Sequence, residues 1–424
     1  MCIALVVGNM IGSGIFLLPA SLAPYGGISI IGWLITAGCS VVIALIFARL
    51  SRMITKTGGP YAYTKDGYGS FPAFLVAWGY WISIWCGNAA ISTALVGYLG
   101  VFFPVINSSP LLACSIALTS VWFLSWVNIY GIREAGYIQV VTSVLKITPL
   151  ILIGIFGLIS LNADHFTPFN VSGTSSFSAI TATAALTLWA FLGLESASIP
   201  ADHIRNPGKT ISKATILGTI IAAAVYIIST TSVMGVINPA ELAESNAPFS
   251  DAARILWGDW AGYLVAGGAA VSCFGALNGW ILLQGQLPRA AALDGLFPKQ
   301  FSRLTARKTP IFGIIISSLL MTLLLIMNFT KGLVEKFTFI IMLATLATLV
   351  PYLFCSLVEW IVRKRSGELL RGKSLVILVT LSGISLLYSS WAVAGLGWEI
   401  ILWGILLFFL GIPFYLLARK QHNQ

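Results

Sequence analysis

The sequence predicts an all-α membrane protein that crosses the bilayer about twelve times, and three observations support this prediction. Of its 424 residues, 58% are hydrophobic and only 9% are charged, whereas soluble domains average about 25% charged residues. Its mean hydropathy is +0.92. Apolar runs of about 20 residues, the length that crosses hydrocarbon as a helix, recur along the whole chain. We therefore expect residues 1–424 to form a single transmembrane domain.

The expected spans are apolar runs bounded by glycine, proline and charged residues. They lie near residues 1–22, 27–49, 70–102, 110–130, 138–161, 177–200, 210–237, 253–285, 309–329, 337–362, 374–393 and 396–418. With the N-terminus placed inside, only Arg254, Lys331 and Lys336 fall on the outer side, and Lys146 lies within a span. The other lysines and arginines lie on the inner side, so the positive-inside rule predicts that both termini are cytoplasmic. This asymmetry also accounts for the net charge of +10 without a nucleic-acid partner.

Several classes of function lack a sequence signature. The six cysteines lie in apolar segments without a CxxC pair, and the three histidines form no ligand constellation, so no metal site is expected. No nucleophile motif, phosphate loop or nucleotide-binding signature occurs. The sequence therefore predicts neither an enzyme nor a bound cofactor.

Glycines interrupt the first expected span. Gly8, Gly12 and Gly14 fall within seven residues, and glycine disfavours a continuous helix. At bilayer depth a helix breaks only where protein or a water-filled cavity satisfies the freed backbone groups. The second half-helix should begin near Ser13, where its free N–H groups would suit a carboxylate. Close packing of two membrane helices through small residues is the alternative. The half-helix that precedes the break is only about 12 Å long, so either the chain starts at Met1 or an upstream segment is absent.

The sixth expected span contains a carboxylate. Glu195 lies deep in the span, beside Gly193 and ahead of Pro200. An intramembrane acid indicates a proton carrier or a counter-charge for a cation, although a structural hydrogen bond to a neighbouring helix is the alternative. Corresponding breaks in two halves of a chain are typical of inverted-repeat transporters, whose site lies at the bilayer midplane.

Four further side chains in the spans have a functional and a structural interpretation. Asn88 in the third span either binds a ligand or makes an interhelical hydrogen bond. Lys146 in the fifth span either pairs or faces a cavity, or else extends to the cytoplasmic interface. Tryptophans in membrane helices, such as Trp189 and Trp280, usually pack against other helices or lie at the membrane–water interface. A cavity containing both tryptophans and Glu195 would nevertheless suit a cation.

Taken together, these motifs resemble those of the amino acid/polyamine/organocation transporters, and most closely the bacterial arginine/agmatine antiporters. The resemblance runs essentially from end to end. It rests on Gly8-Asn9 with Gly12–Ala20, Gly58-Gly59 with Tyr61-Ala62-Tyr63, Thr187-Leu188-Trp189 with Glu195–Ser198, Asn206-Pro207, Gly279-Trp280, Asp294–Pro298 and Leu349–Leu353.

The resemblance implies a LeuT-like fold with a 5+5 inverted repeat. Its repeats would cover about residues 1–161 and 177–362, with broken helices one and six. Two additional C-terminal helices would cover about 374–418.

The resemblance also implies a site in the first, third, sixth and eighth spans. The substrate-binding residues would be Met10, Ser13, Gly14, Ser83, Ile84, Asn88, Trp189 and Trp280. In relatives the substrate carboxylate meets the broken first helix, and its aliphatic part packs on the counterpart of Trp189. The guanidinium stacks on the counterpart of Trp280 and meets that of Asn88 and main-chain carbonyls at Ser83 and Ile84. A gating group would comprise Tyr80, Glu195 and Tyr352.

Three positions depart from the arginine/agmatine pattern. Ala190 and Ala344 stand where those antiporters have serines, which removes two hydroxyl groups. Lys146 stands where they have an apolar residue. In some proton-coupled or sodium-independent carriers of the superfamily, a lysine in this helix takes the place of a sodium ion near the broken first helix.

The resulting hypothesis is a secondary transporter of the bacterial inner membrane that works by alternating access. It would exchange a cationic amino acid such as arginine for its amine, with the small molecule and the lipid bilayer as partners and a homodimer as a family expectation. A proton-coupled permease for neutral or broad-range amino acids that uses Lys146 is the alternative. A sensor that binds an amino acid without moving it is a third hypothesis.

Overall fold

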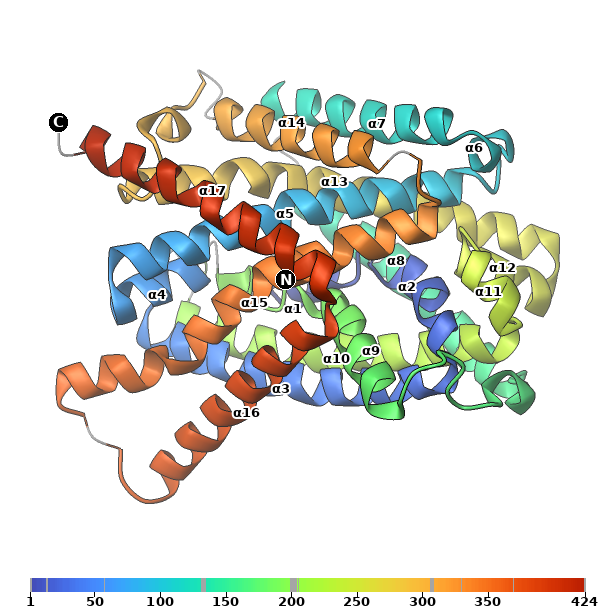
Figure 1. Cartoon of the computed structure of the whole chain (residues 1–424), viewed down its shortest axis with the longest axis horizontal. Coiled ribbons are helices and arrows are strands. Elements are labelled where there is room, and N and C mark those ends of the chain that lie inside the picture. Colours follow the sequence, from blue (N-terminus) through green and yellow to red (C-terminus); the bar gives the residue numbers. More distant parts are fainter. Residues whose placement is uncertain are drawn as a thin grey trace.

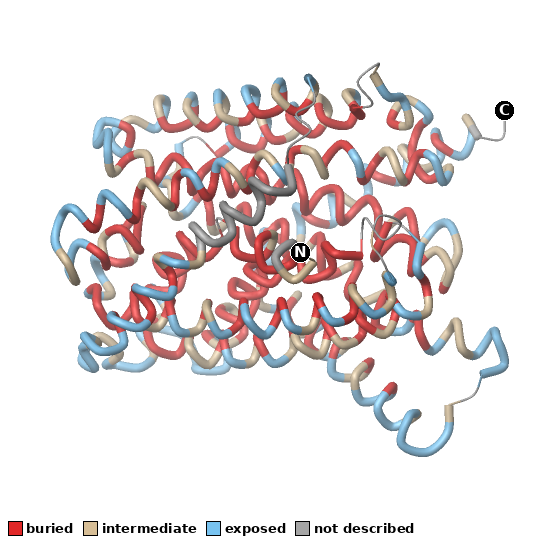
Figure 2. Tube along the Cα trace, turned by 180° about the vertical axis from the view of Figure 1, so that it is seen from behind, coloured by how far each residue is buried: buried red, intermediate tan, exposed pale blue. Residues whose placement is uncertain are grey.

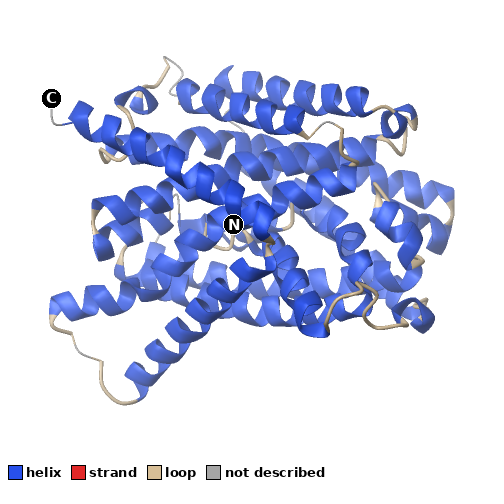
Figure 3. Cartoon of the chain, in the orientation of Figure 1, coloured by secondary structure: helices blue, strands red, loops and turns tan. Residues whose placement is uncertain are grey.

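A computed structural model of the chain describes residues 2–12, 14–56, 58–130, 135–198, 204, 206–305, 309–328, 330–368 and 370–422, with the side chains of residues 4, 5, 135–146 and 422 left undescribed. Helices form almost all of it, and no strand occurs in these ranges (Figure 3). The α-helices are α1 (Cys2–Met10), α2 (Gly14–Leu22), α3 (Ser29–Met53), α4 (Pro60–Tyr68), α5 (Ser70–Leu99), α6 (Val105–Ser108), α7 (Pro110–Tyr130), α8 (Ala135–Ile159), α9 (Ser176–Leu188), α10 (Pro207–Val236), α11 (Pro239–Glu244), α12 (Pro248–Trp257), α13 (Asp259–Leu293), α14 (Ile311–Met327), α15 (Leu333–Ser366), α16 (Lys373–Gly395) and α17 (Trp398–His422). Short 3₁₀ helices are η1 (Ala23–Ile28), η2 (Ala163–Phe166), η3 (Trp189–Phe191), η4 (Ser196–Ser198) and η6 (Lys299–Ser302).

The described helices have the length and composition of membrane spans. Nine of them are long and apolar enough to cross a bilayer, and two shorter apolar helices, Ile147–Ile159 and Ile311–Met327, accompany them. Every predicted span falls on a described helix or on helices separated by a break. The prediction of an all-α polytopic membrane protein is confirmed.

Both predicted interruptions are present. The first span stops at Met10 and resumes at Gly14 as α2. The sixth span ends as an α-helix at Leu188, and its described residues continue as the short turns η3 and η4. Between these turns Gly193 has φ +101°, a conformation that L side chains rarely adopt.

The two interruptions lie against each other. A Cβ built on Gly193 would be 3.5 Å from both the carbonyl carbon and the Cβ of Asn9. The last turn of α1 and the turn after η3 therefore meet in van der Waals contact. Two backbone segments with incomplete helical hydrogen bonding are thus brought to one place.

α5 is the central helix of the molecule. It packs against α13, α15, α7 and α14, and nearly all of its residues are buried. The buried residues concentrate in the middle of the bundle, where α1 also lies (Figures 1 and 2). The face of α5 toward the interruptions is therefore enclosed by protein rather than lipid.

The predicted start of the eighth span, near residue 253, is wrong. α12 ends at Trp257 and α13 begins at Asp259. Gly258 between them has φ 88° and ψ 178°, a region that is essentially open only to glycine, so the chain turns there. α13 then continues to Leu293, beyond the predicted end near residue 285.

The ion pairs of Glu359 and Lys65 lie at one end of the bundle. α4 lies at one end, with the connection between α15 and α16, and α11 and α12 lie at the other (Figure 1). At the α4 end, Glu359 accepts two hydrogen bonds of 2.6 Å from the Arg49 guanidinium. It also accepts one of 2.9 Å from Arg363, although its own side chain is only 3% exposed. Lys65 of α4 and Asp294, just after α13, form a further ion pair of 3.1 Å.

Candidate functional site

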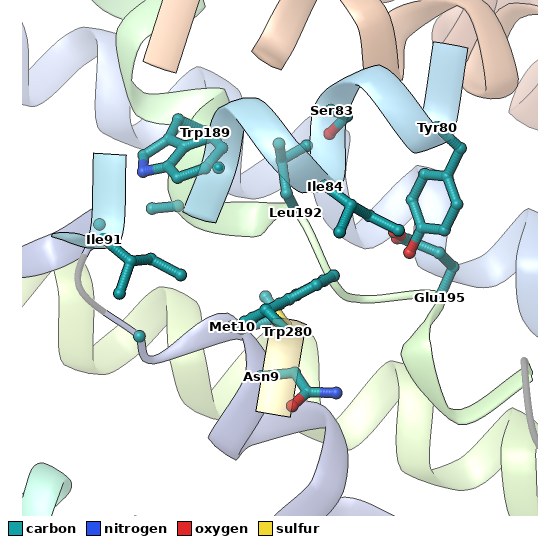
Figure 4. Close-up of a pocket in the computed structure, with 14 residues that line it drawn as sticks. Asn9, Met10, Tyr80, Ser83, Ile84, Ile91, Trp189, Leu192, Glu195 and Trp280 are labelled. Carbon is teal, nitrogen blue, oxygen red and sulfur yellow. The ribbon is translucent and has the colours of Figure 1, made fainter. Parts of the chain in front are cut away.

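A small cavity lies where the two interruptions meet α5 and α13 (Figure 4). Its free volume is about 40 Å³, enough for about three water molecules. It is lined by Asn9, Met10, Gly12, Gly14, Tyr80, Ser83, Ile84, Gly87, Ile91, Trp189, Ala190, Leu192, Glu195 and Trp280. The substrate site predicted from the sequence therefore coincides with this cavity at most of its described positions.

The broken first helix contributes a helix N-terminus to the cavity wall. The Gly12 amide bonds to the carbonyl of Met10 rather than continuing the α-helix. α2 then starts at Gly14, which lines the cavity. The first N–H groups of an α-helix have no partner within it, and the helix dipole places positive charge there. Ser13, predicted at the same place, lies outside the described residues.

The Trp189 indole separates α2 from α5. A Cβ on Gly14 would lie 2.6 Å from Trp189 Nε1, and a Cβ on Gly87 would lie 2.8 Å from its Cη2. Both helices therefore need glycine where the indole passes between them. The indole is 9% exposed, and its N–H has no hydrogen-bond partner among the described residues.

Glu195 lies at another side of the cavity with two tyrosines. Its Oε2 accepts a hydrogen bond of 3.0 Å from the Tyr352 hydroxyl, and the Tyr80 hydroxyl faces the same carboxylate in Figure 4. The residue is fully buried, and within the described chain it forms no ion pair. Among the described residues that line the cavity, Glu195 alone has an acidic or basic side chain.

The rest of the wall is mostly apolar. Trp280 projects from α13 toward Met10 and Asn9, and Ile84 and Leu192 lie opposite (Figure 4). An aromatic face beside a buried carboxylate suits a positively charged group that has lost part of its water.

Two predicted residues with described side chains do not line the cavity. Tyr352 lies behind Glu195 and reaches the site only through that carboxylate. Asn88 donates a hydrogen bond of 2.8 Å to Gln284 of α13, which is the interhelical bond considered as its alternative. Lys146 belongs to α8, and its side chain is outside the described part of the chain.

Several residues that line the cavity were not predicted from the sequence. Gly87, Ile91 and Leu192 have no chemical signature, although a glycine inside a membrane helix is a recognised sign of close packing. Gln284 was also missed, even though a fully buried amide in a membrane helix is a signal of the same kind as Asn88.

The sequence of the chain is similar to a known protein family and to curated proteins. The sequence profile of the family described as amino acid permease matches residues 2–419. The chain belongs to the amino acid permease family. This permease is therefore a membrane transporter of the amino acid/polyamine/organocation superfamily and not an enzyme, as predicted.

Three curated proteins show what the permease is similar to. It is 34% identical to the putrescine transporter PotE of Haemophilus influenzae over 97% of its own length and 94% of that protein. It is 36% identical to the cadaverine/lysine antiporter of Escherichia coli strain K12 over 83% and 80%, respectively. The arginine/ornithine antiporter of Pseudomonas aeruginosa is 32% identical over 99% of the permease and 90% of that relative.

Proposed function

We propose that this permease exchanges a cationic amino acid for an amine across the bacterial inner membrane by alternating access. The observation that carries the proposal is that Glu195 has the one acidic or basic side chain among the described residues that line the cavity. A buried carboxylate without a protein cation is costly in the membrane unless it is protonated or meets a positive charge. A cationic cargo supplies that charge.

The two ends of an amino acid fit different parts of the wall. The N-terminus of α2 at Gly14 suits a carboxylate. The aromatic face of Trp280 and the Glu195 carboxylate suit an ammonium or guanidinium group. The names of the three relatives, which include lysine, arginine, cadaverine and putrescine, support this choice of cargo. None of the three is named for agmatine, so arginine/agmatine exchange remains one hypothesis within the proposal.

The cavity is too small for these molecules, so the cycle requires it to expand. Trp189 is the side chain whose displacement would enlarge it most directly, because it fills the gap between Gly14 and Gly87. We further propose that the α4 end is cytoplasmic, with both termini on that side, since the positive-inside rule favours it. The ion pairs of Arg49 and Lys65 would then close the inner side.

The proposal extends to the internal repeats of the chain. We assign inverted repeats to about residues 1–161 and 177–362, with the last two helices outside them. The interruptions in α1/α2 and after α9, five spans apart, support this division. A homodimer stays an expectation.

The test is exchange by purified permease in liposomes. Vesicles loaded with arginine, lysine or ornithine, or with agmatine, cadaverine or putrescine, should take up labelled arginine, lysine or ornithine. Uptake should need a loaded counter-substrate. Absence of exchange for every pair would contradict the proposal.

The proton-coupled alternative makes a different prediction in the same vesicles. An imposed pH gradient would drive uptake of a neutral amino acid into vesicles without counter-substrate, and Lys146→Ala would abolish it. Uptake that depends on the counter-substrate and survives Lys146→Ala would favour exchange.

A further inference from the structure

Beside the cavity, two buried amide side chains join α5 to α13. Asn88 and Gln284 are both fully buried, and Asn88 Nδ2 donates to Gln284 Oε1 over 2.8 Å. Neither residue lines the cavity. The pair nevertheless borders it, because Ile84, Gly87 and Ile91, which bracket Asn88 along α5, do line it.

Gln284 can point its amide in only one direction. Its Nε2 donates to the backbone carbonyl of Ile314 over 3.4 Å and to Ser318 Oγ over 3.1 Å. A carbonyl oxygen can only accept, so the NH₂ group must face Ile314. Gln284 Oε1 is consequently turned toward Asn88.

The hydroxyl groups of Ser318 and Ser125 support the same orientation of the Gln284 amide. Ser125 Oγ donates to the carbonyl of Val121 and lies 2.8 Å from Ser318 Oγ. Because the Ser125 proton is used on Val121, Ser318 donates to Ser125 and accepts from Gln284. Each hydrogen bond in this series is therefore donated in the direction from Asn88 toward Ser125.

The direction of these hydrogen bonds leaves the side-chain oxygen of Asn88, Oδ1, without a donor among the described residues. With its NH₂ group held by the Gln284 oxygen, Asn88 presents Oδ1 as its remaining polar atom. No described residue donates a hydrogen bond to Oδ1, although the atom is buried. A buried acceptor without a donor is costly, by about 1–3 kcal/mol, and a ligand donor would remove that cost.

We propose that Gln284 is a specificity-determining residue that acts through Asn88: it holds the Asn88 amide so that its oxygen, and not its NH₂ group, meets the cargo. When the cavity expands, Oδ1 is the acceptor at its α13 side, and an ammonium or guanidinium group can donate to it. A neutral aliphatic side chain offers no such donor. This inference rests on the proposed transport of cationic substrates and names a residue that selects them.

The test compares each cationic amino acid with the neutral analogue that resembles it. Lysine is paired with norleucine and ornithine with norvaline, whose side chains have no hydrogen-bond donor, each as a competitor of labelled exchange in liposomes. The preference is the ratio of the two half-inhibitory concentrations. Gln284→Met should reduce it about tenfold, which corresponds to ~1.4 kcal/mol. Ser318→Ala, the matched control, leaves Gln284 bonded to Ile314 and should stay within twofold.

A double variant separates positioning from a general structural effect. If Gln284 acts through Asn88, its replacement should change nothing further once Asn88→Ala is present. Gln284→Leu also removes the side-chain acceptor for Asn88, and it serves as the second variant should Gln284→Met fail to fold.

Three results would overturn the inference: an unchanged preference in Gln284→Met, the same tenfold loss on adding Gln284→Met to Asn88→Ala, or an unchanged preference in Gln284→Leu. Wild-type protein that exchanges none of arginine, lysine and ornithine would overturn the proposed function and this inference together. Wild-type exchange with an unchanged variant preference would overturn the inference alone.

Discussion

Trp189 Nε1 occupies the space that a side chain on Gly14 would need, 2.6 Å from the position of its Cβ. The first turn of α2 is therefore covered by the indole, and the proposed carboxylate site becomes accessible only when the ring moves. The glycine and the tryptophan belong to two spans that are far apart in sequence, so their contact joins both interruptions.

Gly14→Ala should impair substrate binding. Its Cβ would displace Trp189, and we expect the KM for exchange to rise about tenfold, the equivalent of ~1.4 kcal/mol. Gly12→Ala is the control, because a Cβ there would meet no atom nearer than 3.8 Å. Similar KM values for the two variants in a liposome exchange assay would contradict the role given to Trp189.

Trp280→Leu should weaken cationic substrates more than neutral ones. A cation over a desolvated indole gains about 2 kcal/mol, which leucine cannot supply. Competition by lysine should therefore fall by at least tenfold more than competition by norleucine. Trp280→Phe keeps an aromatic face and should lie between wild type and leucine. Equal losses for both competitors would show that Trp280 only fills space.

Glu195→Gln should remove most exchange of cations. The substitution preserves the shape and the hydrogen bond from Tyr352 but removes the charge. It should also flatten the dependence of exchange on pH, since the amide cannot bind or release a proton. Tyr352→Phe removes only one hydroxyl and should reduce exchange less. Initial rates between pH 5 and pH 8 would test both, and a Glu195→Gln profile that matches wild type would exclude Glu195 as a proton carrier.

Glu359→Gln should lower the stability of the α4 end. The carboxylate accepts from both Arg49 and Arg363 while nearly buried, so its loss should cost about 1–3 kcal/mol. Asp66→Asn is the control, because its partner Lys56 is 69% exposed and such pairs contribute little. Thermal unfolding of the purified variants would measure both, and equal melting temperatures would argue against a structural role for Glu359.

The fold was predictable because its main signals are local. Apolar runs locate the spans, and glycines located both interruptions before any contact was known. The start of the eighth span was missed because the apolar run continues across Gly258, where only the backbone angle reveals the turn.

The site was predictable in part. Trp189, Trp280 and Glu195 have distinctive chemistry in a membrane span, and all three line the cavity. The Asn88–Gln284 bond joins residues 196 positions apart, so only the packing of α5 against α13 reveals which atom of Asn88 is free. The contact of Trp189 with Gly87 likewise requires a glycine on α5, which composition alone cannot show.

The enclosure of α5 has a consequence for how this protein is made. Its mean hydropathy of 1.4 is the lowest of the nine described candidate spans, and nearly all of its surface is covered by protein. Two of its main neighbours, α13 and α15, are synthesised more than 150 residues later. The helix that bears Tyr80, Gly87 and Asn88 must therefore reside in lipid or beside the insertion machinery until its partners emerge from the ribosome. Its polar side chains raise the free energy of the helix while it lies in lipid, so this interval is a demanding stage of membrane insertion.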